Sequence, residues 1–302
     1  MAFMPHHCAK KKGWCTAAVA GAMLYSLASN PALAIDVDAG DYTALPDGTN
    51  LGLLYYQHAE RNALYSKGSK IPIGAGLDSD VGILRGVHFM NVGGYIVDPQ
   101  FLLPFGKLKA KNDTSFLGDT SGVSDLILAA TVWLVNKPES GDYFGITPFL
   151  TLPTGQYDHN KALNLGENRT KFTLQAGHIT SLTKKLSLDL VGDFTLYGRN
   201  NNFGVSGATL KQDPTFQGQI HLRYNVTPTF DLRAGLSKTF TGETSVNGAD
   251  QDDRGSTSKF SLGAAYFLRP TTQILATYGR DISVRDGFKE SNRVNVRLLQ
   301  VF

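Results

Sequence analysis

The chain has 302 residues, of which 42% are hydrophobic and 18% charged, and its formal net charge is +3. That excess comes from Lys10, Lys11 and Lys12, the only charged residues in 1–34; residues 35–302 hold 26 basic and 26 acidic side chains. This balance excludes the basic patch of a nucleic-acid partner. Cys8 and Cys15 also lie in 1–34, so the remainder has no disulfide and no thiolate metal site.

Residues 1–34 have the order of a secretory signal peptide. The three lysines precede an apolar stretch at about 13–27, and Ala32-Leu33-Ala34 forms a small-x-small cleavage pattern. The apolar stretch is shorter than the roughly 20 residues that a membrane-spanning helix needs. We therefore expect 1–34 to be a signal peptide cleaved after Ala34, and the chain to be exported.

The rest of the chain is rich in strand and turn formers, with 32 Gly, 17 Phe and 12 Tyr. The strands predicted in chain order lie near 50–60, 81–92, 95–106, 122–135, 143–153, 168–182, 186–196, 215–224, 230–240, 258–268, 272–284 and 291–302. In the second half apolar residues fall on even positions, as when Leu188 and Leu190 flank Asp189. This period of 2 predicts strands with one apolar and one polar face.

The links between these strands alternate in length. Short links are predicted at 93–94, 137–141, 183–185, 225–228 and 269–270, and longer ones at 61–80, 107–121, 155–168, 199–213, 242–257 and 286–290. Bacterial outer-membrane barrels have even strand numbers, short periplasmic turns and longer extracellular loops. We predict an all-β fold, a transmembrane antiparallel up-and-down β-barrel of about 12 strands over 49–302, with 35–48 as a periplasmic segment. A soluble secreted β-sandwich is the alternative, because half-buried strands also alternate.

Aromatic residues support the membrane interpretation. Tyr224 and Tyr266 fall at periplasmic strand ends and Phe216 and Phe240 at the opposite ends, where membrane girdles are expected. The chain ends on Phe302 after an alternating last strand. We interpret Phe302 as a signal for the outer-membrane assembly machinery, so that machinery and the outer-membrane lipids are expected partners.

Charged residues of the polar parity are expected to face the lumen. The ten candidates are Asp125, Asp189, Asp193, Arg223, Asp231, Arg233, Lys259, Asp281, Arg293 and Arg297. Any such barrel has a polar interior, so simple solvation and cross-strand pairing would explain them. Equally, facing carboxylates and guanidiniums would form a constriction that selects among small solutes by charge.

Six short motifs run through this part of the chain: LPDGTNL at 45–51, DPQ at 98–100, LPFG at 103–106, SGVSD at 121–125, LPTGQYD at 152–158 and NLGENR at 164–169. In order and spacing the chain resembles the outer-membrane family named for a putative meta-pathway of phenol degradation. The resemblance implies a channel or transporter for small solutes, phenol-type aromatic compounds among them. It supplies no catalytic residue to carry over.

An outer-membrane enzyme of phospholipase type is the other alternative. His178 and Thr180 lie two apart on the apolar parity, but next to the predicted periplasmic turn and without a third supporting group. Asp250, Asp252 and Asp253 lack the ligand spacing of a calcium loop. We expect no enzyme, no metal and no cofactor.

Overall fold

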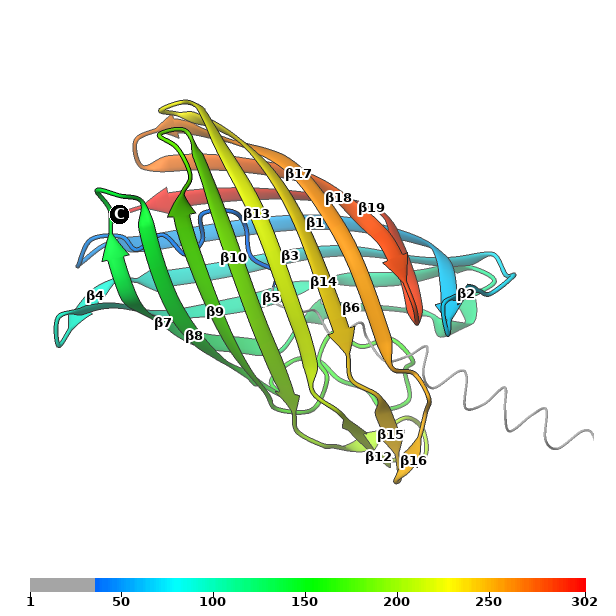
Figure 1. The fold of residues 1–302 in the computed structure, drawn as a ribbon. Coiled ribbons are helices and arrows are strands. Elements are labelled where there is room, and N and C mark those ends of the chain that lie inside the picture. Colours follow the sequence, from blue (N-terminus) through cyan, green and yellow to red (C-terminus); the bar gives the residue numbers. More distant parts are fainter. Residues whose placement is uncertain (1–35) are drawn as a thin grey trace, which may run out of the picture.

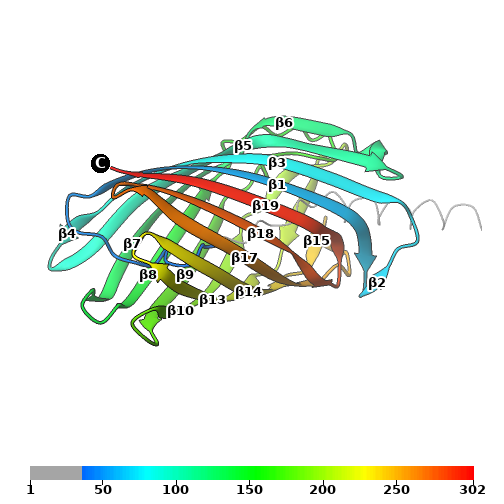
Figure 2. The same cartoon turned by 90° about the horizontal axis from the view of Figure 1, so that it is seen from above.

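The computed structural model describes residues 36–302. Twelve long strands form one antiparallel sheet that closes on itself, because the last strand pairs with the first (Figures 1 and 2). They are β1 (Asn50–Ser66), β3 (Ala75–His88), β5 (Tyr95–Asn112), β7 (Leu126–Lys137), β8 (Asp142–Leu152), β9 (Lys171–Ser181), β10 (Leu186–Tyr197), β13 (Thr215–Thr227), β14 (Phe230–Thr241), β17 (Gly255–Arg269), β18 (Thr272–Val284) and β19 (Gly287–Val301). The predicted twelve-stranded barrel is confirmed, and the β-sandwich alternative is wrong.

Shorter elements lie at the two ends of the barrel. They are β2 (Ser69–Lys70), β4 (Met90–Val92), η1 (Ser115–Leu117), β6 (Asp119–Val123), β11 (Asn200–Phe203), β12 (Ala208–Gln212), β15 (Thr244–Val246) and β16 (Ala249–Asp250). Strands β11, β12, β15 and β16 form a separate four-stranded sheet over one end of the barrel. The tight turns lie at the other end, together with the C-terminus (Figure 1). No helix in residues 36–302 is long and apolar enough to cross a membrane.

The two faces of the wall have opposite chemistry. On the outer face, Ile220 and Leu262 are 49% and 55% exposed, whereas the neighbouring Gln219 on the inner face is 2% exposed. An apolar belt outside and a polar interior are what lipid and an aqueous lumen require. The parity predicted from the sequence therefore assigns the two faces as the structure has them.

The first three long strands extend further than predicted. β1, β3 and β5 have 17, 14 and 18 residues, and they take up residues 61–66, 75–80 and 107–112 of the loops predicted at 61–80 and 107–121. On their extensions the outward side chains are charged: Lys111 binds Asp78, and Lys107 lies 3.5 Å from Asp80. The inward side chains there are apolar, and Leu77, Leu108 and Ala110 pack with Leu117 and Leu163. Alternation therefore continues beyond the membrane, but with the apolar side chains on the inner face instead of the outer one.

The segment before β1 lies inside the barrel. Residues 36–44, which we call the plug, pack against inward side chains near the end that carries the tight turns. Trp133 donates its Nε1–H to the carbonyl oxygen of Tyr42 at 3.0 Å, and Tyr42 is itself 5% exposed. This position differs from the periplasmic segment predicted for residues 35–48. The plug has no periodicity, so its partners on distant strands were not visible in the sequence.

Candidate functional site: the plugged lumen

Acidic side chains of the plug bind basic side chains of β19. Arg297 Nη1 lies 3.0 Å from Asp38 Oδ2 and 2.8 Å from Asp41 Oδ1. The Arg297 side chain is 5% exposed, and its Nη2 also donates to Gln273 Oε1 at 3.0 Å. A guanidinium presents five donors in a fixed planar arrangement, so one arginine can hold two carboxylates at once.

A second cluster fixes the beginning of the plug. Asp36 Oδ2 lies 3.0 Å from Arg293 Nη1 and 3.3 Å from Lys259 Nζ, and its Oδ1 accepts from Gln217 Nε2 at 2.9 Å. Glu290 extends the cluster, since its carboxylate lies 3.5 Å from both Lys259 and Arg293. Opposite charges of β17, β19 and the plug therefore meet in the lumen.

Backbone atoms of the plug are bound as well. Gly40 donates its N–H to Asp189 Oδ2 at 2.6 Å, and Ala39 accepts from Arg233 Nη1 at 2.6 Å. Asp231 holds that arginine in turn, with 2.5 Å between its Oδ1 and Arg233 Nε. The plug forms turns of its own, in which the N–H groups of Asp41 and Thr43 bind the carbonyl oxygens of Asp38 and Gly40. The lumen side chains satisfy further N–H and C=O groups of the plug, at Gly40 and Ala39.

The ring of Tyr42 anchors the plug at its other end. Its hydroxyl lies 3.0 Å from Thr147 Oγ1 and donates to Gln175 Oε1 at 3.0 Å. A Cβ added to Gly177 would lie 2.2 Å from Tyr42 Cδ2, closer than any real contact. Glycine at this position on β9 therefore gives the aromatic ring its space.

The structure places the ten predicted lumen residues in three groups. Asp189, Arg233, Lys259, Arg293 and Arg297 bind the plug directly. Arg223 lies against Gly40, while Asp231 binds Arg233, Asp193 accepts from Gln175, and Asp281 accepts from the N–H of Glu290. Asp125 lies apart, near the extracellular loops, where it accepts the N–H groups of Gly155 and Glu167 at 2.9 and 2.8 Å.

Several residues of the site were missed from the sequence. Asp36, Asp38 and Asp41 supply the charges opposite the predicted arginines, and their close spacing directly after the proposed cleavage position was the signal available. Glu290 was missed for another reason. It opposes Arg61 at 2.6 Å across a register shift in the β1–β19 pairing, and such a shift removes a residue from a simple parity count.

The lumen beyond the plug is divided into small cavities. One of about 140 Å³ lies beside the plug and Arg85, and a second of about 110 Å³ lies nearer the extracellular loops; Gln57 lines both. The second cavity also shares Asn164 and Glu167 with a pocket of about 230 Å³ at the mouth. Neighbouring cavities thus adjoin one another from the mouth to the plug.

A buried ion-pair group stabilises the mouth. Glu167 lies 2.7 Å from Arg169 and 2.6 Å from Lys171, on the loop between β8 and β9. Burial alone would raise the pKa of Glu167, but the adjacent cations outweigh it and lower this pKa to about 2. The carboxylate is therefore ionised at neutral pH, and its charge is balanced within the loop.

The candidate catalytic pair lies on the outer face near a tight turn. His178 Nε2 contacts Asp142 Oδ1 at 2.8 Å, an acidic partner that the sequence analysis did not identify. Within residues 36–302, however, no serine or threonine hydroxyl is hydrogen-bonded to His178. A general base needs a nucleophile within hydrogen-bond reach, so the arrangement is a hydrogen-bonded pair at the surface of the barrel and no triad.

A closed barrel with an apolar outer belt, a polar lumen and a lumenal plug defines an outer-membrane channel. The chain superimposes on the crystal structure of an outer membrane channel from Pseudomonas putida F1 with a TM-score of 0.85, 43% identity, and coverage of 88% of this chain and 100% of that one. Residues 61–298 match the family model described as "Putative MetA-pathway of phenol degradation". The chain belongs to this family.

More distant structures share the fold alone. The β-domain of the Bordetella autotransporter BrkA matches with a TM-score of 0.51 and 11% identity, over 85% of this chain and 100% of that one. The transport unit of the autotransporter AIDA-I from Escherichia coli matches with a TM-score of 0.50 and 11% identity, over 93% and 96%. No curated protein is similar enough to the chain to count as a match.

Proposed function

We propose that the solutes of this outer-membrane channel include single-ring aromatic compounds, and that the plug limits their passage. The observation that carries the proposal is the plug itself, which is bound to charged residues from opposite walls, with cavities of about 140 and 110 Å³ beside it and toward the mouth. A cavity of about 150 Å³ is known to accommodate benzene. The cavities next to the plug are thus close in size to a single ring, which supports a single-ring solute.

The charged residues around the plug suit a selective constriction. Arg85, Arg293 and Arg297 face three plug carboxylates, so a solute that displaces the plug meets fixed charges of both signs. Charges in a narrow pore of low dielectric act strongly on ionised solutes. We propose the ten lumen residues named above as candidates for this selection, Asp125 through its position at the mouth.

The proposal can be tested by the permeability of benzoate relative to chloride. Purified protein is inserted into planar bilayers with sodium benzoate on one side and sodium chloride on the other, and the reversal potential is measured. We expect benzoate to carry current, and larger anions such as naphthalene disulfonate to carry none. A current carried by chloride and not by benzoate would contradict the proposed aromatic solute.

Three finer points belong to the same proposal. Cleavage after Ala34 would place the mature N-terminus one residue before Asp36, which the mass of the purified protein tests. Phe302, 76% exposed and bound through its N–H to the carbonyl of Asn50, would be read by the assembly machinery. Deleting Phe302 should then lower the amount of protein in the outer membrane. We also propose that the channel has no enzymatic activity, so the detergent-extracted protein should not hydrolyse phospholipid.

A further inference from the structure

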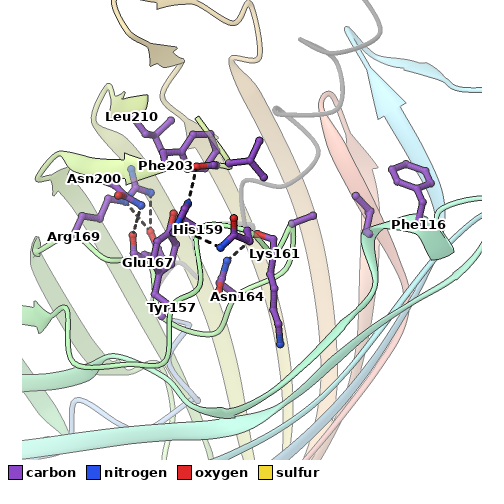
Figure 3. A pocket seen from close by; sticks show the side chains of 16 residues that line it. Phe116, Tyr157, His159, Lys161, Asn164, Glu167, Arg169, Asn200, Phe203 and Leu210 are labelled. Atoms are coloured by element: carbon purple, nitrogen blue, oxygen red, sulfur yellow. Dashed lines mark hydrogen bonds and ion pairs between the residues drawn. The ribbon is translucent and has the colours of Figure 1, made fainter. Parts of the chain in front are cut away.

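The pocket at the mouth of the barrel combines apolar and charged side chains from three separate loops. It has a volume of about 230 Å³ (Figure 3). Phe203 and Leu210 come from the small extracellular sheet, Phe116 comes from the loop after β5, and His159 and Lys161 come from the loop after β8. We propose that this pocket is a capture site for a single-ring aromatic solute that carries an ionised carboxylate or a hydroxyl group. The proposal rests on the function proposed above and adds a place and a chemistry to it.

The apolar part of the pocket is left open to water. Phe116 is 60% exposed and Val205 66% exposed, although both lie on loops beyond the membrane. Lipid cannot cover them there, and an exposed apolar patch of this kind is typical of a binding site. In Figure 3, Phe203 lies on one side of Lys161 and Phe116 on the other. Two aromatic side chains at the borders of one pocket favour a planar ring as the occupant.

The charge of the pocket favours an anion or a hydroxyl group. Lys161 lines the pocket, is exposed, and has no carboxylate within ion-pair distance in the part of the chain that the structure describes. Glu167, which also lines the pocket, is neutralised by Arg169 and Lys171. The available net charge is therefore positive, and the apolar surroundings strengthen its attraction for a carboxylate.

The polar side chains hold the pocket in shape before any solute arrives. Tyr157 donates its hydroxyl hydrogen to the carbonyl of Asn202 at 3.0 Å, and His159 Nδ1 lies 3.3 Å from the carbonyl oxygen of Gly204. Asn164 accepts the N–H of Asp158 at 2.8 Å and so closes the turn that carries Lys161. These bonds tie the loop after β8 to the small extracellular sheet. A preformed site loses less conformational entropy on binding than a flexible one.

The pocket also leads toward the lumen. Asn164 and Glu167 line both this pocket and the adjoining cavity of about 110 Å³, which reaches Thr195 and Thr215 on the inner wall. At about 230 Å³ the pocket is larger than the cavity of about 150 Å³ that accommodates benzene, so a ring with one substituent fits. A solute captured at the mouth would thus already lie next to the path to the plug.

The inference can be tested by binding of sodium benzoate and of phenol to the full-length barrel in detergent, measured by calorimetry. Phe203→Ala should weaken the binding of both by about tenfold, the effect of losing one aromatic contact. Lys161→Met should weaken benzoate more than phenol. Phe216→Ala removes the same side chain from the lipid-facing wall, where Phe216 is 55% exposed, and should leave both affinities unchanged.

Each outcome decides for or against the site. Equal benzoate affinity in the wild type, Phe203→Ala and Lys161→Met would overturn the inference, and so would the absence of benzoate binding by the wild type. The bi-ionic current measurement decides the proposed function separately, because a channel can pass benzoate without a capture site at its mouth. Chloride conductance of Phe203→Ala should stay at the wild-type level, since the residue lies outside the plug.

Discussion

Removing either side of the ion pairs between the plug and β19 should open the channel, but the two resulting variants should prefer ions of opposite charge. Arg293→Gln with Arg297→Gln removes two positive charges, whereas Asp36→Asn, Asp38→Asn and Asp41→Asn together remove three negative ones. Breaking a buried ion pair by removing one partner costs about 3–5 kcal/mol. Taking the lower value, the population with a displaced plug should rise by roughly 100-fold in either variant.

Single-channel recording in planar bilayers measures both consequences. Each variant should have a higher open probability than the wild type. The arginine variant leaves unpaired carboxylates and should shift the reversal potential toward cation selectivity, while the aspartate variant leaves unpaired guanidiniums and should shift it toward anions. Both shifts should shrink at roughly 1 M salt, where the Debye length is about 3 Å. Unchanged open probability in both would refute the plug as a barrier, and shifts of equal sign would refute the charge assignment.

Three further predictions concern the wall, the plug and the mouth. Gly177→Ala should clash with the aromatic ring of the plug and raise the conductance, whereas Gly192→Ala, whose new Cβ would come no closer than 3.9 Å to another atom, should leave it unchanged. Leu262→Arg on the lipid face should lower the free energy of unfolding by about 2–4 kcal/mol, and the adjacent Ser261→Arg in the lumen much less, as measured by urea unfolding in liposomes. The lowered pKa of Glu167 makes its stabilisation of the mouth complete above pH 4.5 and lost as the pH falls toward about 2, so cleavage of the loop by pepsin should rise steeply over that range in the wild type and only weakly in Glu167→Gln.

The wall of the barrel could be predicted because every spanning strand has lipid on one side and water on the other. That difference imposes a period of 2, and the predicted boundaries of β14 and β18 differ from the observed ones by at most one residue. The prediction failed beyond the membrane, where the outer face of the strand no longer contacts lipid. The extension of β5 has Lys107 and Lys111 on its outer face and Leu108 and Ala110 on its inner face, so its apolar parity is the reverse of that within the membrane, and the continuation of the strand was not recognised.

Of the candidate site, only the residues on the barrel wall could be predicted from the sequence. Parity assigned Arg293 and Arg297 to the lumen because they lie on a regular strand. Their partners Asp36 and Asp38 lie on a segment without regular structure, more than 250 positions earlier in the sequence. A pattern of neighbouring residues contains no information on such a contact. The mouth pocket could not be predicted from the sequence either, because three loops of unrelated sequence form it together.

The long separation between the plug and β19 also determines when the plug can bind during folding. Its ion pairs join residues 257 and 259 positions apart, so they cannot form until the last strand has been placed beside the first. The transition state for closing the barrel should therefore lack these contacts. Substitutions in the plug would then change the rate of unfolding and leave the rate of folding nearly unaltered. In that case the segment made first by the ribosome is the last to reach its native position.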